Sequence, residues 1–177
     1  MPHIHTANGQ HDHTVTAYII RTDTSEPMAL VHMHKKLHKL LPVGGHIELS
    51  ETPWQAMAHE IQEESGYELS DLVLLQPVSR IKHLSGVALH PYPLNVNAHS
   101  ITRTHFHSDM AYGFIASSEP SGSIEDAEST DLRWLTQTEL GGLQEPDIFL
   151  NTKETYSFMF TECLGNWERI PAVAFQV

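Results

Sequence analysis

The chain has 177 residues, 40% of them hydrophobic, and a formal net charge of −12 at pH 7. This length and composition fit one globular domain with a sizeable core. The negative charge argues against nonspecific binding to nucleic acid or to anionic membranes. No hydrophobic run approaches the roughly 20 residues of a transmembrane helix. The N-terminus, MPHIHTANGQHDH, lacks the basic and then apolar pattern of a signal peptide.

The single cysteine, Cys163, excludes an internal disulfide and fits a reducing compartment, so we expect a cytoplasmic protein. Cys163 belongs to a helical apolar pattern, which favours a core position over a nucleophile. We treat residues 1–177 as one domain with a His-rich N-terminal segment at about 1–13.

The first third of the chain predicts two strands. Residues 14–19 alternate polar and apolar side chains, which is typical of a half-buried strand. Met28–Met33 predicts a second strand, and the intervening TDTSEP predicts a turn. A basic loop at 35–39 follows.

A well-defined helix comes next. Thr52 is suited to the N-cap, Pro53 to the first helical position, and Gln55 completes a capping box. Gly66 is a natural terminator. One apolar face recurs at i, i+3, i+4 and i+7, formed by Trp54, Met57, Ala58 and Ile61.

Three carboxylates, Glu60, Glu63 and Glu64, lie beside that apolar face, about 100° around the helix. Like charges at this spacing repel, and a divalent cation would remove the repulsion. Oxygen-rich sites suit magnesium or manganese. A solvated acidic helix is the alternative, which the preceding Gly-Gly turn and the loop glutamates, Glu48 and Glu51, make less favourable.

The second half of the chain predicts further strands at 72–78, 94–98, 110–116 and 131–135. An acidic loop occupies 117–130, and Thr136 is suited to cap a short helical turn. Residues 147–164 predict a final amphipathic helix that Gly165 would end. Mixed strands and helices indicate an α/β layered domain.

The segment from Gly45 to Tyr67, GHIELSETPWQAMAHEIQEESGY, resembles the Nudix box, G-x5-E-x7-R-E-U-x-E-E-x-G-U, where U is a bulky apolar residue. One fixed position differs, because His59 stands where the family has Arg. A later segment, THFHSDMAYGF, is similar to an H-x-H-x-D segment of some family members. The box residues that match in register are Gly45, Glu51, Glu60, Ile61, Glu63, Glu64 and Gly66.

The resemblance implies a Nudix-type α/β/α sandwich with a mixed β-sheet. It also implies hydrolysis, by water, of a pyrophosphate bond in a nucleoside diphosphate linked to another group. Mg²⁺ or Mn²⁺ would be the cofactor. The implied metal ligands and catalytic groups are Glu60, Glu63 and Glu64, with the backbone carbonyl of Gly44 as a further ligand.

Supporting roles are expected for Gly45, Glu51 and His59. His59 lies four residues before Glu63, so their side chains can meet on the helix. We predict that a protonated His59 partly replaces the bracing Arg of the family and adds a pH dependence below neutrality.

The resemblance implies that the general base is either a box glutamate or a carboxylate of a later loop. The loop candidates are Glu119, Glu125, Asp126, Glu128 and Asp131, and we favour Glu128 because it shortly precedes a predicted strand. Arg80 and Arg103 are the favoured phosphate-binding residues. We expect a small phosphorylated substrate of the nucleotide class, expect neither nucleic acid nor membrane as a partner, and leave a homodimer open.

The chain contains 14 histidines, several in alternating pairs. Paired residues share one face of a strand and could hold a transition metal. Because the pairs lack matching cysteines or a defined third ligand, we interpret them as ordinary surface histidines. The pairs are His3/His5, His11/His13, His32/His34 and His105/His107.

Two other functions stay open. A catalytically impaired Nudix-fold module for ligand binding or regulation is favoured by His59 and disfavoured by the intact glutamates. A His-rich metal-storage or metal-sensing protein would bind metal without turning over a nucleotide.

Overall fold

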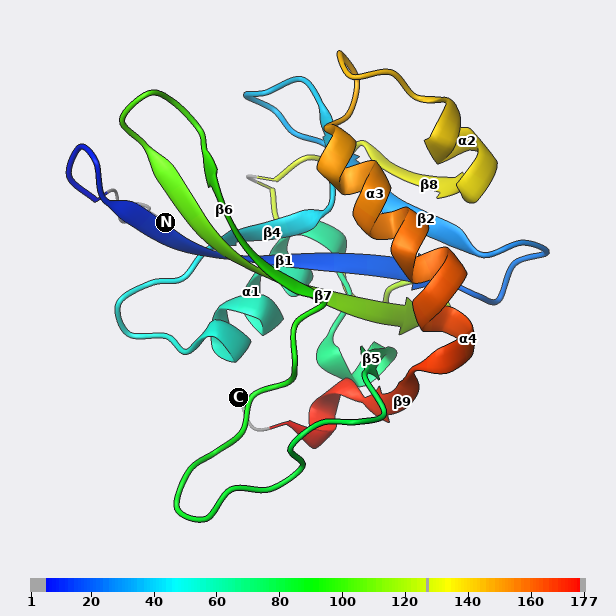
Figure 1. The fold of residues 1–177 in the computed structure, drawn as a ribbon. Coiled ribbons are helices and arrows are strands. Elements are labelled where there is room, and N and C mark those ends of the chain that lie inside the picture. Colours follow the sequence, from blue (N-terminus) through cyan, green and yellow to red (C-terminus); the bar gives the residue numbers. More distant parts are fainter. Residues whose placement is uncertain (1–5, 127, 176–177) are drawn as a thin grey trace.

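A computed structural model describes residues 6–126 and 128–175 (Figure 1). Its strands are β1 (His11–Arg21), β2 (Met28–Met33), β3 (Leu40–Leu41), β4 (Val43–His46), β5 (Leu72–Gln76), β6 (Asn95–Ser100), β7 (Phe106–Ala116), β8 (Leu132–Thr136) and β9 (Glu168–Pro171). These nine strands of the described residues form one sheet with the main order β3-β2-β1-β7-β5-β9. In addition, β4 pairs with β1, β6 with β7 and β8 with β2.

The sheet is mixed. Strands β1 and β7 run parallel through its centre, paired from His11 with Phe106 to Arg21 with Ala116 (Figure 1). Their other neighbours pair antiparallel, including β4 on β1 and β6 on β7. The central pair therefore fixes which residues of β1, β4 and β7 share a face.

Helices cover both faces of this sheet. They are α1 (Pro53–Ser65), α2 (Gln137–Gly142), α3 (Leu150–Phe158) and α4 (Leu164–Asn166), with 3-10 turns at Leu69–Asp71 and Ala172–Ala174 and a π-helical turn at Met159–Cys163. Val15 of β1 packs in one buried cluster with Trp54 of α1, whereas Tyr18 packs in a second cluster with Tyr156 of α3. This arrangement confirms the α/β/α sandwich.

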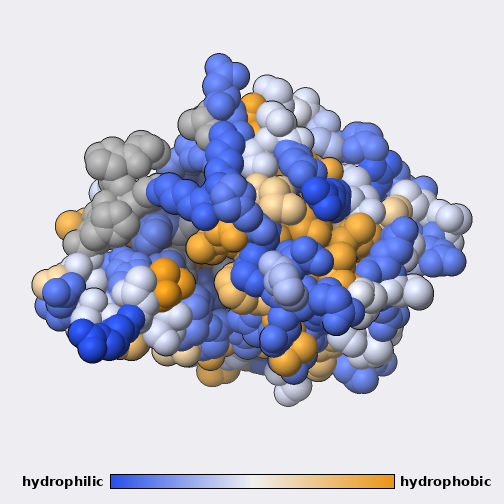
Figure 2. All heavy atoms as spheres, turned by 90° about the horizontal axis from the view of Figure 1, so that it is seen from above, coloured by the Kyte–Doolittle hydropathy of each residue, from blue (hydrophilic) through white to orange (hydrophobic). Residues whose placement is uncertain are grey.

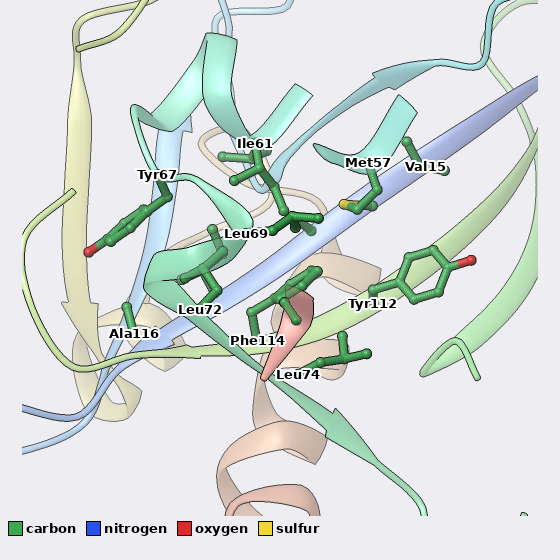
Figure 3. Packing of buried hydrophobic residues seen from close by; sticks show 14 of the residues in the cluster. Val15, Met57, Ile61, Tyr67, Leu69, Leu72, Leu74, Tyr112, Phe114 and Ala116 are labelled. Atoms are coloured by element: carbon green, nitrogen blue, oxygen red, sulfur yellow. The ribbon is translucent and has the colours of Figure 1, made fainter. Parts of the chain in front are cut away.

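The core under α1 is visible in close-up. Met57 and Ile61 point from α1 toward Val15 of β1 and toward Tyr112 and Phe114 of β7 (Figure 3). All five side chains are buried. The apolar face of α1 thus sets the rotation of the helix about its own axis, and with it the direction of the glutamates.

The predicted ends of α1 are confirmed. Thr52 Oγ1 accepts from the amide of Gln55 at 3.2 Å, and Gln55 Oε1 accepts from the amide of Thr52 at 2.8 Å. Gly66 follows the helix at φ +73°, a left-handed conformation that glycine adopts without penalty. A Cβ on Gly66 would also meet the carbonyl oxygen of Gly122 at 2.8 Å.

Several boundaries differ from the prediction. Strand β7 begins at Phe106 rather than near 110, because pairing with β1 and β6 outweighs its polar sequence. Strand β5 ends at Gln76, before Pro77, which has no amide hydrogen to donate. The short strands β3, β4 and β9 are not evident from the sequence, and β4 contains two glycines.

The last helical segment begins at Leu150 rather than at 147, and it contains the π-helical turn. Gly165 lies within α4 and does not end it; the chain becomes extended at Trp167, just before β9 pairs with β5. Cys163 is buried, and burial raises the pKa of its thiol to about 12, as expected of a core residue.

Figure 2 shows the molecule from above, relative to the view of Figure 1. The surface on this side is mostly hydrophilic, with separate hydrophobic patches. Within the described residues, the helices are too short or too polar to cross a membrane.

Candidate active site

Strand β4 delivers two glycines to the carboxylate face of α1. The amide of Gly44 donates to Glu64 Oε2 at 2.8 Å. Gly44 has φ +153°, and a Cβ there would lie 2.2 Å from the carbonyl oxygen of Val15. Only glycine therefore allows this approach of β4 to β1.

Gly45 lies directly against Glu60. A Cβ on Gly45 would meet both carboxylate oxygens of Glu60, at 2.2 and 2.7 Å. Because glycine has no Cβ, the Glu60 carboxylate can occupy the space next to the backbone at this position. This contact gives a physical reason for a glycine at the first position of the motif.

Glu60 and Glu64, one helical turn apart, lie in surroundings that disfavour their negative charge. Burial raises the pKa of Glu60 to about 7; the nearby His59 opposes the rise, and Glu63 adds to it. Burial also raises the pKa of Glu64 well above its usual value, although the hydrogen bond from Gly44 opposes this. A positive ion beside them would restore the charged forms.

His59 bridges the two remaining box carboxylates. Its Nδ1 lies 3.2 Å from Glu51 Oε1, and its Nε2 lies 2.6 Å from Glu63 Oε1. Partial burial of the ring opposes its charge, but the hydrogen bonds and charges of Glu63 and Glu51 outweigh it and raise the pKa of His59. The predicted contact with Glu63 is confirmed, and Glu51 is a second partner.

Glu48 lies in the loop that contains Glu51, and its contacts are made by its backbone. Its amide lies 3.3 Å from Glu51 Oε2, and its carbonyl accepts from the amide of Glu51 at 3.0 Å. Glu48 therefore shapes the loop that presents Glu51.

His32 is a neighbour of the site that sequence reasoning missed. It is buried on β2, with Nε2 3.7 Å from Glu64 Oε2. Burial lowers the pKa of His32 to about 4, so the ring is neutral at pH 7 and the contact is not an ion pair. The alternation of residues in β2 predicts that His32 is buried, but its position next to Glu64 depends on the tertiary fold.

Glu128 comes from the loop before β8. Its negative charge raises the pKa of both Glu60 and Glu64, so its carboxylate lies close enough to interact with theirs. The loop is attached to α1 by a hydrogen bond from the amide of Glu125 to the carbonyl of Glu63, at 3.0 Å. The fold therefore brings the favoured loop carboxylate toward the box.

The NUDIX domain family matches residues 12–157, which include β1 to most of α3. The chain belongs to the Nudix family.

Solved structures agree with this assignment. The chain is similar to a NUDIX-family hydrolase from Clostridium perfringens, with a TM-score of 0.68 and 29% identity over 85% of this chain and 99% of that chain. The C. elegans Ap4A hydrolase has the same fold, with a TM-score of 0.60 and 11% identity over 84% of this chain and 95% of that one.

The NUDIX domain of Shewanella oneidensis NrtR, in complex with ADP ribose, gives a TM-score of 0.62 and 14% identity over 86% of this chain and 90% of that chain. A comparison with proteins of curated function finds no match. The family and its hydrolase relatives make this chain a Nudix pyrophosphohydrolase.

The two arginines predicted to bind phosphate differ in their surroundings. Arg80 Nη1 donates to the carbonyl of Pro77 at 2.7 Å and to Glu168 Oε2 at 2.5 Å, beside β9. This ion pair gives Arg80 a structural partner at the β5–β9 side of the sheet. Arg103 is exposed in the turn between β6 and β7.

Proposed function

We propose that this Nudix hydrolase cleaves the pyrophosphate bond of a nucleoside diphosphate linked to another group, with Mg²⁺ or Mn²⁺ as cofactor. The proposed ligands are three carboxylates and one backbone carbonyl, from Glu60, Glu63, Glu64 and Gly44. The strongest supporting observation is the close contact of the Glu60 carboxylate with Gly45. One helical turn away, the Glu64 carboxylate accepts a hydrogen bond from the amide of Gly44.

The donor set suits a hard divalent cation. Carboxylate oxygens are the ligands that Mg²⁺ and Mn²⁺ prefer. Glu60 and Glu64 have raised pKa values because burial penalises their charge, and a cation would offset that penalty. When bound, such an ion supplies charge neutralisation at phosphate oxygens and lowers the pKa of water.

The protein's own groups have separate roles in the proposal. Glu128 accepts the proton of the attacking water, since its charge is felt at Glu60 and Glu64. Arg103 remains the proposed phosphate contact, because it is exposed, whereas Arg80 is engaged by Glu168. His59 holds Glu51 and Glu63 in place.

The substrate class is proposed from chemistry and from the relatives. A pyrophosphate substrate presents several anionic oxygens, which suits a cation held by carboxylates. Two proteins of the same fold act on or bind compounds of this kind: one is an Ap4A hydrolase, and the other forms a complex with ADP ribose. The substrate of this chain is accordingly expected among nucleotides that contain a phosphoric anhydride.

A screen of such nucleotides with Mg²⁺ or Mn²⁺, with product identification, tests the proposal. ADP ribose, diadenosine polyphosphates and nucleoside diphosphate sugars form the first panel. We expect turnover that a chelator abolishes. Binding without turnover of any compound, in protein with intact glutamates, would instead favour the impaired binding module.

The nucleophile is tested in oxygen-18 water under single-turnover conditions. We propose that water attacks phosphorus, because the single cysteine is buried in the core, and one phosphate product should then contain the label. An unlabelled product or a trapped phospho-enzyme would overturn the mechanism.

A further inference from the structure

Four side chains that commonly ligate transition metals gather where β1, β4 and β7 lie side by side. One donor atom from each of Asp12, His46, His105 and His107 lies within 4.8 Å of the other three. Asp12 pairs with His107 across β1 and β7, and His46 pairs with Thr14, two residues along β1. Alternation places these side chains on one face of the sheet, with His105 two residues before His107.

We propose that these four residues form a zinc site. Asp12 Oδ2 lies 3.4 Å from His105 Nε2 and 3.7 Å from His46 Nε2. His105 Nε2 and His107 Nε2 are 3.1 Å apart. Ligands about 2.0–2.1 Å from a tetrahedral zinc ion are about 3.3–3.4 Å from one another, which these separations bracket.

The carboxylate is already oriented toward the imidazoles. Asp12 is buried, and its Oδ1 accepts a hydrogen bond from the amide of Thr6 at 2.8 Å. The other oxygen, Oδ2, is the one that faces His46 and His105. Metal-binding carboxylates are commonly held by such an outer hydrogen bond, which fixes the direction of the ligating oxygen.

The zinc site is distinct from the carboxylate site in place and in chemistry. Strand β4 separates them, because Gly45 faces Glu60 while the next residue, His46, projects to the opposite face of the sheet. Three imidazoles and one carboxylate select zinc-type ions, whereas an all-oxygen set selects magnesium or manganese. The inference does not depend on the proposed substrate or mechanism.

The fold supplies what the histidine pairs lack in sequence. His105 and His107 gain Asp12 and His46 as further ligands, from strands far away along the chain. His11 and His13 flank Asp12 but alternate to the other face of β1. His3 and His5 lie outside the described residues. In this proposal, His105 and His107 are zinc ligands and not ordinary surface histidines.

Cobalt(II) is the spectroscopic probe for the test. Metal-free full-length protein is titrated with Co²⁺ while excess Mg²⁺ occupies the carboxylate site. We expect about one equivalent of Co²⁺ with the intense visible bands of a tetrahedral ion, and its displacement by Zn²⁺. Zn²⁺ at about 100 times its dissociation constant should raise the melting temperature by about 5–10 °C.

His105→Ala should abolish the tetrahedral spectrum and the Zn²⁺-dependent rise in melting temperature. Its side chain is 25% exposed, so the variant should fold, which circular dichroism checks. Asp12→Asn is the second variant and should lose the same two signals. His83→Ala and His90→Ala, in the loop between β5 and β6, are matched histidine controls that should behave as wild type.

Two further variants separate this site from other sources of binding. His3→Ala/His5→Ala and Glu60→Gln should both keep the tetrahedral cobalt spectrum. Its loss in either variant, its retention in His105→Ala, or a weak octahedral spectrum in wild type would overturn the proposal.

Discussion

The amide of Gly44 and Oε2 of Glu64 are joined by a 2.8 Å hydrogen bond that connects β4 to the last turn of α1. Because the donor is a backbone amide within a paired strand, the Glu64 carboxylate is positioned by the sheet as well as by its own helix. The neutral ring of His32 borders the same oxygen from β2. Mutations in β4 and in α1 should therefore affect the same chemistry.

Glu60→Gln and Glu64→Gln should each lower turnover by at least ~10²-fold, the scale of losing a principal electrostatic contributor. Both variants should fold, since a glutamine side chain has the same shape and keeps an acceptor for Gly44. Glu63→Gln should have a smaller effect. Steady-state kinetics with Glu154→Gln, an exposed residue of α3, as the control checks this. Wild-type rates in the first two variants would remove them from the active site.

The metal-free protein should show a pH-dependent stability that arises from Glu60. Burial raises the pKa of Glu60 from 4.5 to about 7 in the folded state. The resulting stability is fully present below the unfolded value of 4.5 and is lost as the pH rises through about 7.

Glu60→Gln should therefore melt higher than wild type at pH 8, by about 3 °C or more. The gap should close as the pH falls from 7 toward 4.5, the unfolded value. Calorimetry in the presence of a chelator measures it. With saturating Mg²⁺ the order should reverse, because wild type binds the ion more tightly. A gap that does not change with pH would contradict the assignment to this carboxyl.

Gly45→Ala should reduce activity strongly without unfolding the protein. The new Cβ would lie 2.2 Å from one Glu60 oxygen, and the flexible carboxylate would have to move aside. We expect a loss of about tenfold or more and a weaker activation by Mg²⁺. Gly141→Ala is the matched control, because a Cβ at that position meets no atom within 4 Å. Equal activity of the two variants would show that the close fit is unimportant.

His59→Arg and His59→Ala should separate bracing from catalysis. The pKa of His59 is raised above 6.5, so its ionic contribution is fully present below pH 6.5 and is lost as the pH rises through the folded value. Wild type should match His59→Arg at low pH and fall behind it at high pH, by roughly two- to fivefold. His59→Ala should be the less active of the two throughout.

Rates measured from pH 5.5 to about 9 with saturating metal check this behaviour. Identical profiles for wild type and both variants would show that His59 has no bracing role.

Local signals made α1 predictable. Thr52, Gln55 and Gly66 act on the backbone within one turn, and the apolar spacing identifies the face that packs on β1. Because the helix ends and its buried face were both correct, the grouping of Glu60 and Glu64 followed from sequence alone. Their contacts with Gly44 and Gly45 were not predictable, since they depend on how β4 pairs with β1.

Residues brought together by strand pairing were out of reach. Asp12 and His107 are neighbours because β1 and β7 are parallel and in a particular register, which no local pattern encodes. The position of His32 behind Glu64 depends on the sheet in the same way. Arg80 was chosen for its chemistry, but Glu168, which the fold brings beside it, is its partner.

The fixed ends of α1 make the candidate active site sensitive to the length of this helix. Glu60 is the eighth residue after the Thr52 cap, and each residue turns an α-helix by about 100°. Deleting a single residue between them would swing every later carboxylate by that angle, toward the apolar core or toward solvent. A substitution such as histidine for arginine at position 59 leaves this angular setting unchanged. Evolution can therefore vary the chemistry of α1 far more readily than its number of residues.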